Sequence, residues 1–406
     1  MDSLIRAIAT GLDAVEYEIF GASTNHGKRI AVLCIEMGKA LGKSLDENMH
    51  MANCALLHDN ALTESYLAER SGGHHDPVMK EHCICGQRNI GFLCRSGRAD
   101  NLVLYHHERA DGNGPFGIRA GEGPLAAELI AIADSVDVTW HLQRLGSGDL
   151  ASVRQFIAER AGTVYSKAAA GAMLEILDWP AILSLRDDAI HKTAEAAFAP
   201  WYIDAGADEC FGMAKLITKI IDYKSAFTRK HSAQIANRAW YMGGYLHYDE
   251  AKRIDLFLAA SFHDIGKLKT PTAILEKPGK LSNEEFLIIK EHVYHTWEML
   301  KDIEGFELIC AWASNHHEKL NGAGYPFGKK AEELDYNSRL MACIDVYQAV
   351  SEERPYHPAR NHSDTMQILY KMADSGGIDR SVADDLSLAF MHHDGRELPP
   401  PEAMGT

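Results

Sequence analysis

Apolar residues recur at helical rather than strand spacing along the 406-residue chain. After Asp208, apolar side chains follow at the intervals of one helix face: Phe211, Leu216, Ile217, Ile220 and Ile221. Further on, Ser282 stands three residues before Glu285, the spacing of a capping box, which predicts a helix start there. Alternating apolar and polar runs of the strand type are scarce. The pattern therefore predicts an all-α fold.

Histidines and aspartates interrupt these apolar helical patterns twice, in the same order. The first series is His26, His58, Asp59, His82, His106, His107 and Asp134. The second series is His231, His263, Asp264, His292, His316, His317 and Asp345. Several spacings are identical in the two series, such as 26 to 58 against 231 to 263, and 82 to 106 against 292 to 316. A repeat of this length predicts two tandem copies of one helical domain.

The boundary between the copies is expected near residue 200. The stretch 194–199 is rich in alanine and ends at Pro200, where a helix would stop. We therefore predict a first domain over 1–200 and a second over 201–395. The remaining residues, 396–406, are rich in proline and are predicted to form a disordered tail.

The two series have the chemistry of a metal centre. A single histidine on an apolar helix face is usually a core residue, but seven such positions in a fixed order favour ligands. Imidazole nitrogen with carboxylate oxygen suits iron, manganese, nickel, cobalt or zinc. Two ions about 3.5–4 Å apart can hold a phosphodiester, generate a hydroxide and stabilise the leaving oxygen.

Four motifs in the second copy resemble those of a known family. They are HDIGK at 263–267, HHE at 316–318, NGAGYP at 321–326 and, after Asp345, RPY at 354–356. Over residues 217–382 the chain resembles the HD-GYP branch of the HD-domain phosphohydrolases. The resemblance implies an all-helical bundle with a metal centre that hydrolyses cyclic dinucleotides, cyclic di-GMP above all. Cyclic GMP-AMP is the next expected substrate, because Ser225 replaces the usual aspartate of a KDPYT segment.

The same resemblance implies a role for each site residue. Asp264 would bridge two divalent ions and, with Lys267, is expected to be catalytic. One ion would be held by His231, His263 and Asp345, and the other by His292, His316 and His317. The expected substrate contacts are Lys267, Tyr325, Arg354 and His357. Iron or manganese is favoured, with nickel, cobalt, zinc or magnesium as alternatives, and Glu318 would orient a ligand.

The first copy keeps all seven ligand positions but not the expected substrate groups. Leu62 stands where the second copy has Lys267, and Gly114-Pro115-Phe116 replaces Gly324-Tyr325-Pro326. The first copy is therefore interpreted as a degenerate regulatory or dimerising domain that carries a candidate second metal site. An active site for a different substrate is the alternative interpretation.

The net charge and the hydropathy of the chain indicate which partners and which location to expect. A formal net charge of −16 disfavours polymeric nucleic acid and anionic membranes as partners. No apolar run approaches the roughly 18 residues of a membrane span, so a cytoplasmic location is expected. A second copy of the chain or a signalling protein remains an expected partner. Two other functions stay open, namely a cyclic-dinucleotide-sensing scaffold with structural metal sites and a di-iron HD-domain oxygenase.

Overall fold

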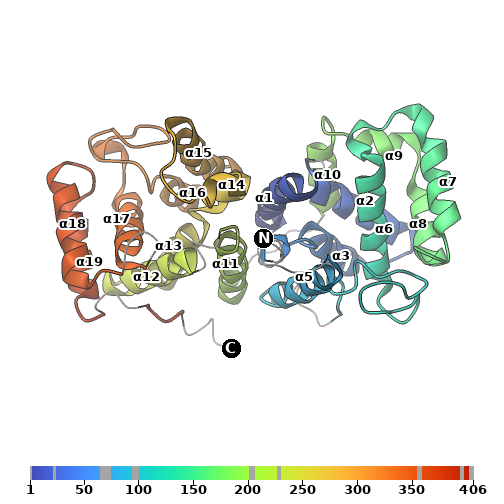
Figure 1. Ribbon diagram of the computed structural model, residues 1–406, viewed down its shortest axis with the longest axis horizontal. Helices are drawn as coiled ribbons and strands as arrows, with labels where there is room; N and C mark the ends of the chain where they lie inside the picture. Colours follow the sequence, from blue (N-terminus) through green and yellow to red (C-terminus); the bar gives the residue numbers. More distant parts are fainter. Residues whose placement is uncertain are drawn as a thin grey trace. The chain divides into compact units, whose positions relative to one another are not determined.

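The computed structural model describes residues 2–21, 24–64, 75–93, 100–200, 206–225, 230–353, 359–393 and 397–401. The chain divides into two compact units, Met1–Asp204 (unit 1) and Ala205–Thr406 (unit 2). Unit 1 runs from blue to green in Figure 1, and unit 2 from yellow-green to red. The described residues of both units form helices and no strand, so the all-α prediction is confirmed.

Unit 1 is built from α-helices joined by short 3₁₀ segments and loops. Its helices are α1 (Asp2–Phe20), α2 (His26–Ala40), α3 (Leu45–Leu56), α5 (His75–Ile90), α6 (Leu125–Trp140), α7 (Leu150–Arg160), α8 (Lys167–Ile176), α9 (Trp179–Ser184) and α10 (Ile190–Phe198). The 3₁₀ segments are η1 (Leu142–Arg144) and η2 (Ser147–Asp149). Helix α2 packs against α3 and α6. The middle of α2 contributes buried apolar residues to the core, such as Ile30, Leu33 and Ile35.

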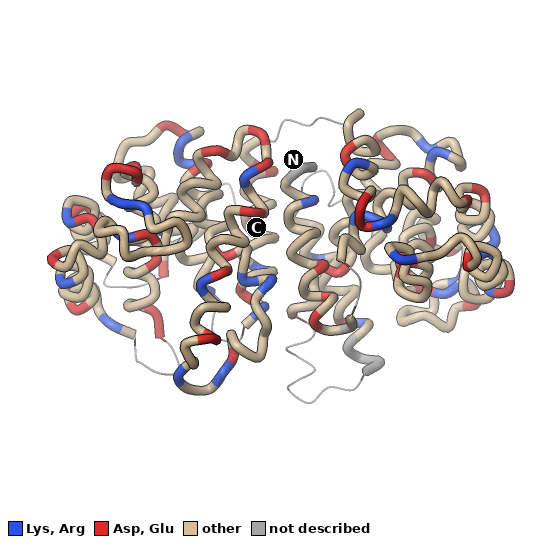
Figure 2. Tube along the Cα trace, turned by 90° about the horizontal axis from the view of Figure 1, so that it is seen from above, with Lys and Arg blue, Asp and Glu red and all other residues tan. Residues whose placement is uncertain are grey.

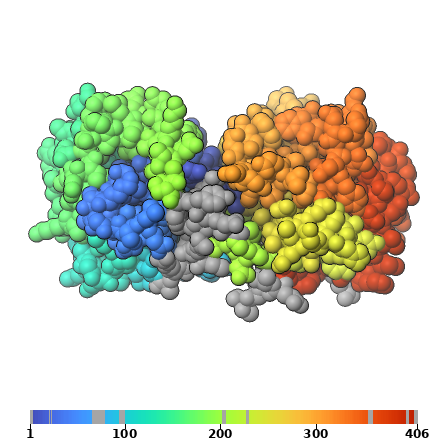
Figure 3. Space-filling view, turned by 180° about the vertical axis from the view of Figure 1, so that it is seen from behind, coloured from blue at the N-terminus to red at the C-terminus, as the bar shows by residue number. Residues whose placement is uncertain are grey.

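Unit 2 repeats this arrangement. Its helices are α11 (Ala207–Asp222), α12 (His231–Tyr245), α13 (Glu250–Phe262), α14 (Thr272–Leu275), α15 (Asn283–Leu300), α16 (Glu307–Ser314), α17 (Tyr336–Ser351), α18 (His362–Asp374) and α19 (Arg380–Phe390). The 3₁₀ segments are η3 (Ile265–Lys269) and η4 (Ala331–Glu333). Helix α12 packs against α13 and α17, which correspond to α3 and α6 of unit 1. The space-filling view shows the yellow α12 region beside the red C-terminal helices of the same unit (Figure 3).

Local sequence explains where the ligand-bearing helices begin. Ser44 and Glu47 form a capping box at the start of α3, and Ser282 and Glu285 form another at α15. In each box a side-chain oxygen satisfies an N–H group that the first helical turn leaves without a partner. Asp249 caps α13 by accepting a hydrogen bond from Lys252 N. These caps set the register in which the following histidines and aspartates face the interior.

Gly266 permits a close approach of η3 to α15. A Cβ atom at this position would lie 1.9 Å from the carbonyl oxygen of His292 and 2.7 Å from the amide nitrogen of Thr296. Thr296 Oγ1 accepts a hydrogen bond from Gly266 N and donates one to His263 O. The glycine of the HDIGK motif thereby joins the two segments that carry His263 and His292.

The predicted disordered tail is wrong for the described residues 397–401. Leu398 is buried, and both its backbone N–H and its carbonyl group form hydrogen bonds with side chains of α12. Its carbonyl accepts from Asn237 Nδ2 at 2.9 Å, and its N–H donates to Gln234 Oε1 at 2.9 Å. The three prolines that follow have restricted backbones, which lowers the entropy cost of ordering the segment.

Acidic and basic residues are interspersed along the helices and loops of both units (Figure 2). Among the described residues no helix is long and apolar enough to cross a membrane.

Candidate metal centres

Five separate segments of unit 2 bring the predicted ligands together. His231 begins α12, His263 and Asp264 follow α13, His292 lies within α15, His316 and His317 follow α16, and Asp345 lies within α17. All of these except His317 are buried or nearly so. The helical bundle thus gathers residues more than 100 positions apart into one polar cluster within an apolar core.

Asp264 lies between two groups of imidazoles. Its Oδ1 is 3.3 Å from Nε2 of His292, and its Oδ2 is 3.2 Å from Nε2 of His263. Nε2 of His316 is 4.0 Å from the same Oδ1. A carboxylate with one oxygen toward each imidazole group has the geometry of a bridging ligand.

Asp345 closes the other side of the cluster. Its Oδ1 is 3.5 Å from Nε2 of His231, and its Oδ2 is 3.9 Å from Nδ1 of His317. The adjacent residues His316 and His317 both face the centre because α16 ends at Ser314 and they occupy the turn that follows. Their ring centroids are 4.2 Å apart.

Five histidine rings in the two units are oriented by the same local hydrogen bond. In each, Nδ1 is bonded to the carbonyl oxygen three residues upstream: His58 to Ala55, His106 to Val103, His263 to Ala260, His292 to Ile289 and His316 to Ala313. With the proton on Nδ1, the Nε2 lone pair points into the cluster. The Nε2 atoms of all five are buried without a hydrogen-bond partner among the described residues.

These unpaired nitrogens fit bound metal ions. A buried acceptor without a donor costs about 1–3 kcal/mol, and several in one place call for a shared partner. Burial, reinforced by the neighbouring histidines, lowers the pKa of His316 well below its usual range and that of His317 to about 4. Burial opposes ionisation of Asp264, yet His263 and Lys267 hold the pKa of its carboxyl well below the usual range. Although burial opposes it, Asp345 and Glu352 raise the pKa of His231 to about 9, so this imidazole would have to lose a proton to bind a metal ion. Neutral imidazoles, as at His316 and His317, and ionised carboxylates are the donors that a divalent cation requires.

Lys267 lies in a 3₁₀ segment and not on a continuation of α13, because α13 ends at Phe262. In this tighter turn Lys267 Nζ reaches Oδ2 of Asp264 at 2.5 Å, with the side chain 20% exposed. A positive charge therefore stands at the solvent edge of the cluster.

Two further predicted substrate contacts, Arg354 and His357, lie outside the described residues. Tyr325 is described, and its ring lies 4.9 Å from that of His317. Its hydroxyl-bearing ring therefore forms a wall of the metal cluster.

Glu318 has a different role from the one predicted. Its carboxylate accepts backbone hydrogen bonds from Phe327, Gly328 and Lys329, at 2.7, 3.1 and 3.0 Å. In unit 1 the Glu108 carboxylate likewise accepts from Phe116 and Ile118. Within the described part of the chain, the carboxylate of this glutamate bonds to the glycine-rich loop and to none of the candidate metal ligands.

Lys290 is a residue near the cluster that the sequence did not single out as functional. It lies in α15, two residues before His292, and its Nζ is 5.0 Å from the ring of Tyr325 and 4.8 Å from that of Phe286. The signal was the Lys-Glu-His sequence, which both copies share at 80–82 and 290–292. A cation between two aromatic rings adds to the positive edge that Lys267 begins.

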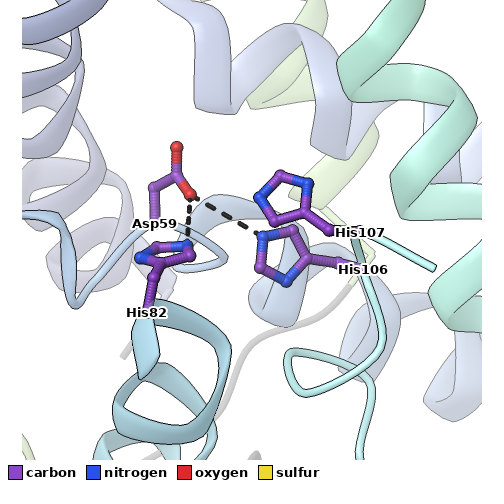
Figure 4. A group of neighbouring side chains, drawn as sticks. All are labelled: Asp59, His82, His106 and His107. Atoms are coloured by element: carbon purple, nitrogen blue, oxygen red, sulfur yellow. Dashed lines mark ion pairs between the residues drawn. The ribbon is translucent and has the colours of Figure 1, made fainter. Parts of the chain in front are cut away.

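Unit 1 contains a second cluster with nearly the same geometry. Asp59 Oδ1 is 2.9 Å from Nε2 of His82 and 3.7 Å from Nε2 of His106, and Figure 4 shows these side chains converging with His107. On the other side, Asp59 Oδ2 is 3.5 Å from Nε2 of His58. His26 Nε2 lies 3.2 Å from Oδ1 of Asp134. All seven predicted positions of the first copy thus lie around one centre.

Unit 1 adds a carboxylate that sequence reasoning missed. Glu16, on α1, is 4% exposed, and its Oε2 lies 3.7 Å from Nε2 of His26. A carboxylate oxygen of Glu16 also lies within 4.8 Å of ligand atoms of His58 and Asp59. The signal was an acidic residue inside the apolar pattern of the first helix, where burial without a partner would be costly.

Comparison with known proteins identifies the family. A family model described as HD domain matches residues 215–382. The 3'3'-cGAMP-specific phosphodiesterase 1 of Vibrio cholerae is 28% identical over 93% of this chain and 89% of its own length. The 3'3'-cGAMP-specific phosphodiesterase 3 of the same organism is 31% identical over 77% of this chain and 67% of its own. A cyclic di-GMP phosphodiesterase of Pseudomonas aeruginosa is 28% identical over 48% of each chain.

A solved structure has the same fold. The crystal structure of a cyclic GMP-AMP specific phosphodiesterase of V. cholerae covers 97% of this chain and 98% of its own, with a TM-score of 0.64 and 21% sequence identity. The fold and its His/Asp clusters define an HD-domain hydrolase. The chain belongs to the HD-domain phosphodiesterases of the HD-GYP type.

Proposed function

We propose that unit 2 hydrolyses a phosphodiester bond of a cyclic dinucleotide with the help of two divalent ions. The observation that supports this most is the position of Asp264. Its two oxygens face separate imidazole groups, and the Nε2 atoms of His263, His292 and His316 have no hydrogen-bond partner among the described residues. Lys267 adds the positive charge that a phosphate needs at the open edge of such a centre.

Cyclic GMP-AMP with 3',3' linkages is the substrate we propose first. Relatives whose similarity extends over most of this chain are named as phosphodiesterases specific for that molecule. The similarity to cyclic di-GMP phosphodiesterases extends over about half of the chain or less. Cyclic di-GMP, which the motifs of unit 2 favoured, is the second substrate to test.

The residues of unit 2 divide the work of hydrolysis. Asp264, Asp345 and the five histidines would hold iron or manganese ions, which activate water and neutralise charge on the phosphoryl group. The Lys267 ammonium would bind a phosphate oxygen as a point charge. Lys290 and the Tyr325 ring would contact the nucleotide where it enters. The water oxygen bonds to phosphorus, the bond from phosphorus to a ribose oxygen breaks, and that oxygen gains a proton, leaving a linear dinucleotide.

Product analysis of the full chain tests this proposal. The protein, stripped with a chelator and reloaded with Mn²⁺ or Fe²⁺, would be incubated with 3',3'-cyclic GMP-AMP, cyclic di-GMP and cyclic di-AMP, and the products separated by chromatography. We expect linear dinucleotide from the first substrate and loss of turnover in His263→Ala. His392→Ala, which removes an exposed imidazole, is the matched control and should keep full activity. A folded, metal-loaded protein that cleaves none of the three would refute the proposed function.

A further inference from the structure

The two centres differ most at one position next to the bridging aspartate. Leu62 N donates to Asp59 O at 3.1 Å, and Lys267 N donates to Asp264 O at 2.9 Å, so the two residues occupy the same position of the same turn. In unit 2 the ammonium at this position contacts the bridging carboxylate. In unit 1 a buried leucine replaces it and leaves the corresponding Asp59 oxygen without a cationic neighbour at that position.

A second difference lies near the helix that precedes each centre, and here unit 1 has the charged residue. Asp13 accepts a hydrogen bond from Gly27 N at 2.9 Å, and Asp222 accepts one from Ser232 N at 3.0 Å. Gly27 and Ser232 each follow the first ligand histidine, so Asp13 and Asp222 correspond. Three residues further along stand Glu16 in unit 1 and Ser225 in unit 2. Unit 1 therefore gains a carboxylate where unit 2 has a hydroxyl.

Together these exchanges change the charge of the centre. With all carboxylates ionised, Asp264, Asp345 and Lys267 give unit 2 a formal charge of −1. Asp59, Asp134 and Glu16 sum to −3 in unit 1 when, as in unit 2, only the carboxylates and the lysine position are counted and the histidines are left out. The more negative centre favours bound cations and disfavours a phosphate, since a buried charge is stable only beside a compensating charge.

Several buried donor atoms of unit 1 are arranged like a set of metal ligands. Glu16 Oε2, His58 Nε2, His82 Nε2 and His106 Nε2 are all buried and have no hydrogen-bond partner among the described residues. They converge from α1, α5 and the turns that precede α5 and α6. Unlike surface acids, these groups cannot be satisfied by bulk water.

We propose that unit 1 is a resident metal site in which Glu16 is a ligand, and that it binds divalent ions without acting on phosphate. Iron or manganese suits its nitrogen and oxygen donors. The glycine-rich loop of unit 1, which Glu108 anchors, also differs from the loop of unit 2 that would contact substrate. The left-handed glycines Gly112 and Gly117 of this loop are one residue closer in sequence than Gly322 and Gly328, and no tyrosine stands between Gly112 and Gly117.

Metal content of the full chain tests the proposal without reference to substrate. Protein stripped with a chelator would be reloaded with Mn²⁺ alone and analysed for manganese per chain and for melting temperature. Glu16→Gln keeps the shape of the side chain but removes its charge. We expect it to weaken uptake of the unit 1 ions on the order of tenfold, with hydrolysis by unit 2 unchanged. Glu18→Gln, exposed on the same helix, is the matched control and should retain the wild-type metal content.

A second variant tests the charge argument from the other side. Leu62→Lys places an ammonium beside Asp59, as Lys267 lies beside Asp264, and should lower manganese uptake by unit 1, whereas Leu62→Met should not. Manganese content and melting temperature that stay at wild-type values in both Glu16→Gln and Leu62→Lys would overturn the proposal. Because unit 2 keeps its own ligands in these variants, that result would leave the proposed hydrolysis untouched.

Discussion

Lys267 Nζ lies 2.5 Å from Oδ2 of Asp264, the carboxylate that also faces His263 and His292. One side chain thus lies between the candidate metal ligands and solvent. The lysine neutralises part of the charge of the metal-free centre and lies at its solvent edge, where a phosphate would enter.

Lys267→Ala should therefore separate the two functions. Loss of a hydrogen bond to a charged phosphate costs about 1.5–3 kcal/mol, which corresponds to roughly a 10- to 150-fold fall in kcat/KM. Metal content should not fall, because removing a cation from beside Asp264 does not weaken a metal ligand. Steady-state kinetics with elemental analysis measure both effects. Lys269→Ala, which removes a lysine paired with Glu298, is the control, and wild-type kinetics in Lys267→Ala would show that phosphate is bound elsewhere.

Lys290→Ala should act on substrate binding more than on the chemical step. The ammonium lies beside Tyr325 rather than beside the bridging carboxylate, so its loss removes binding without disturbing the ligands. We expect KM to rise while kcat stays within about twofold. This is the pattern for a contact that stabilises the bound substrate and the transition state equally. The exposed Lys280 provides the matched control, Lys280→Ala. A fall in kcat with unchanged KM would instead place Lys290 in the reaction itself.

Glu318→Ala should loosen the loop that carries Tyr325. Three part-buried backbone N–H groups would lose their acceptor, and net loss of a hydrogen bond to a charged group costs about 1.5–3 kcal/mol of the free energy of unfolding. Activity should fall with stability, because the Tyr325 ring would lose its fixed place beside His317.

Glu108→Ala makes the corresponding change in unit 1 and serves as the comparison. It should lower the free energy of unfolding similarly while leaving turnover unchanged. Urea denaturation and steady-state kinetics on both variants separate the loop effect from general destabilisation. Equal losses of activity in the two variants would mean that stability alone is responsible.

Gly266→Ala should be strongly destabilising. The added methyl group would overlap the carbonyl of His292, so η3 and α15 must move apart. Overpacking of this kind costs about 1–3 kcal/mol, and here it would also separate His263 from His292. Urea denaturation and metal content should therefore decline together. Gly171→Ala, in α8 with no atom within 4 Å of the added methyl, should be neutral or stabilising.

The ligand positions could be predicted because they recur. Two series of the same residue types, with several identical spacings, indicate fourteen candidate positions, and the structure places all fourteen around two centres. Glu16 could not be found this way, because unit 2 has Ser225 at the corresponding position. A residue that occurs in only one copy carries no repeat signal, and only the packing of α1 shows that it faces His26.

Other errors came from local geometry. The course of the chain after His263 depends on a change from α to 3₁₀ helix, which the residue types alone do not reveal. The order of residues 397–401 depends on Gln234 and Asn237, more than 150 positions away in the sequence. Such contacts are tertiary, and composition alone favoured disorder.

The hydrogen bonds that orient five of the histidines are short-range, each spanning three residues of one turn. Each turn therefore fixes the orientation of its own imidazole, independently of the loops that would contact substrate. After duplication, one copy of such a domain can lose its substrate groups by single replacements, as at Leu62, without dismantling the ligand sphere. The hydrogen bonds that orient the imidazoles and the groups that would bind substrate can therefore change independently, so a copy that lacks the substrate groups can keep its candidate ligands in place.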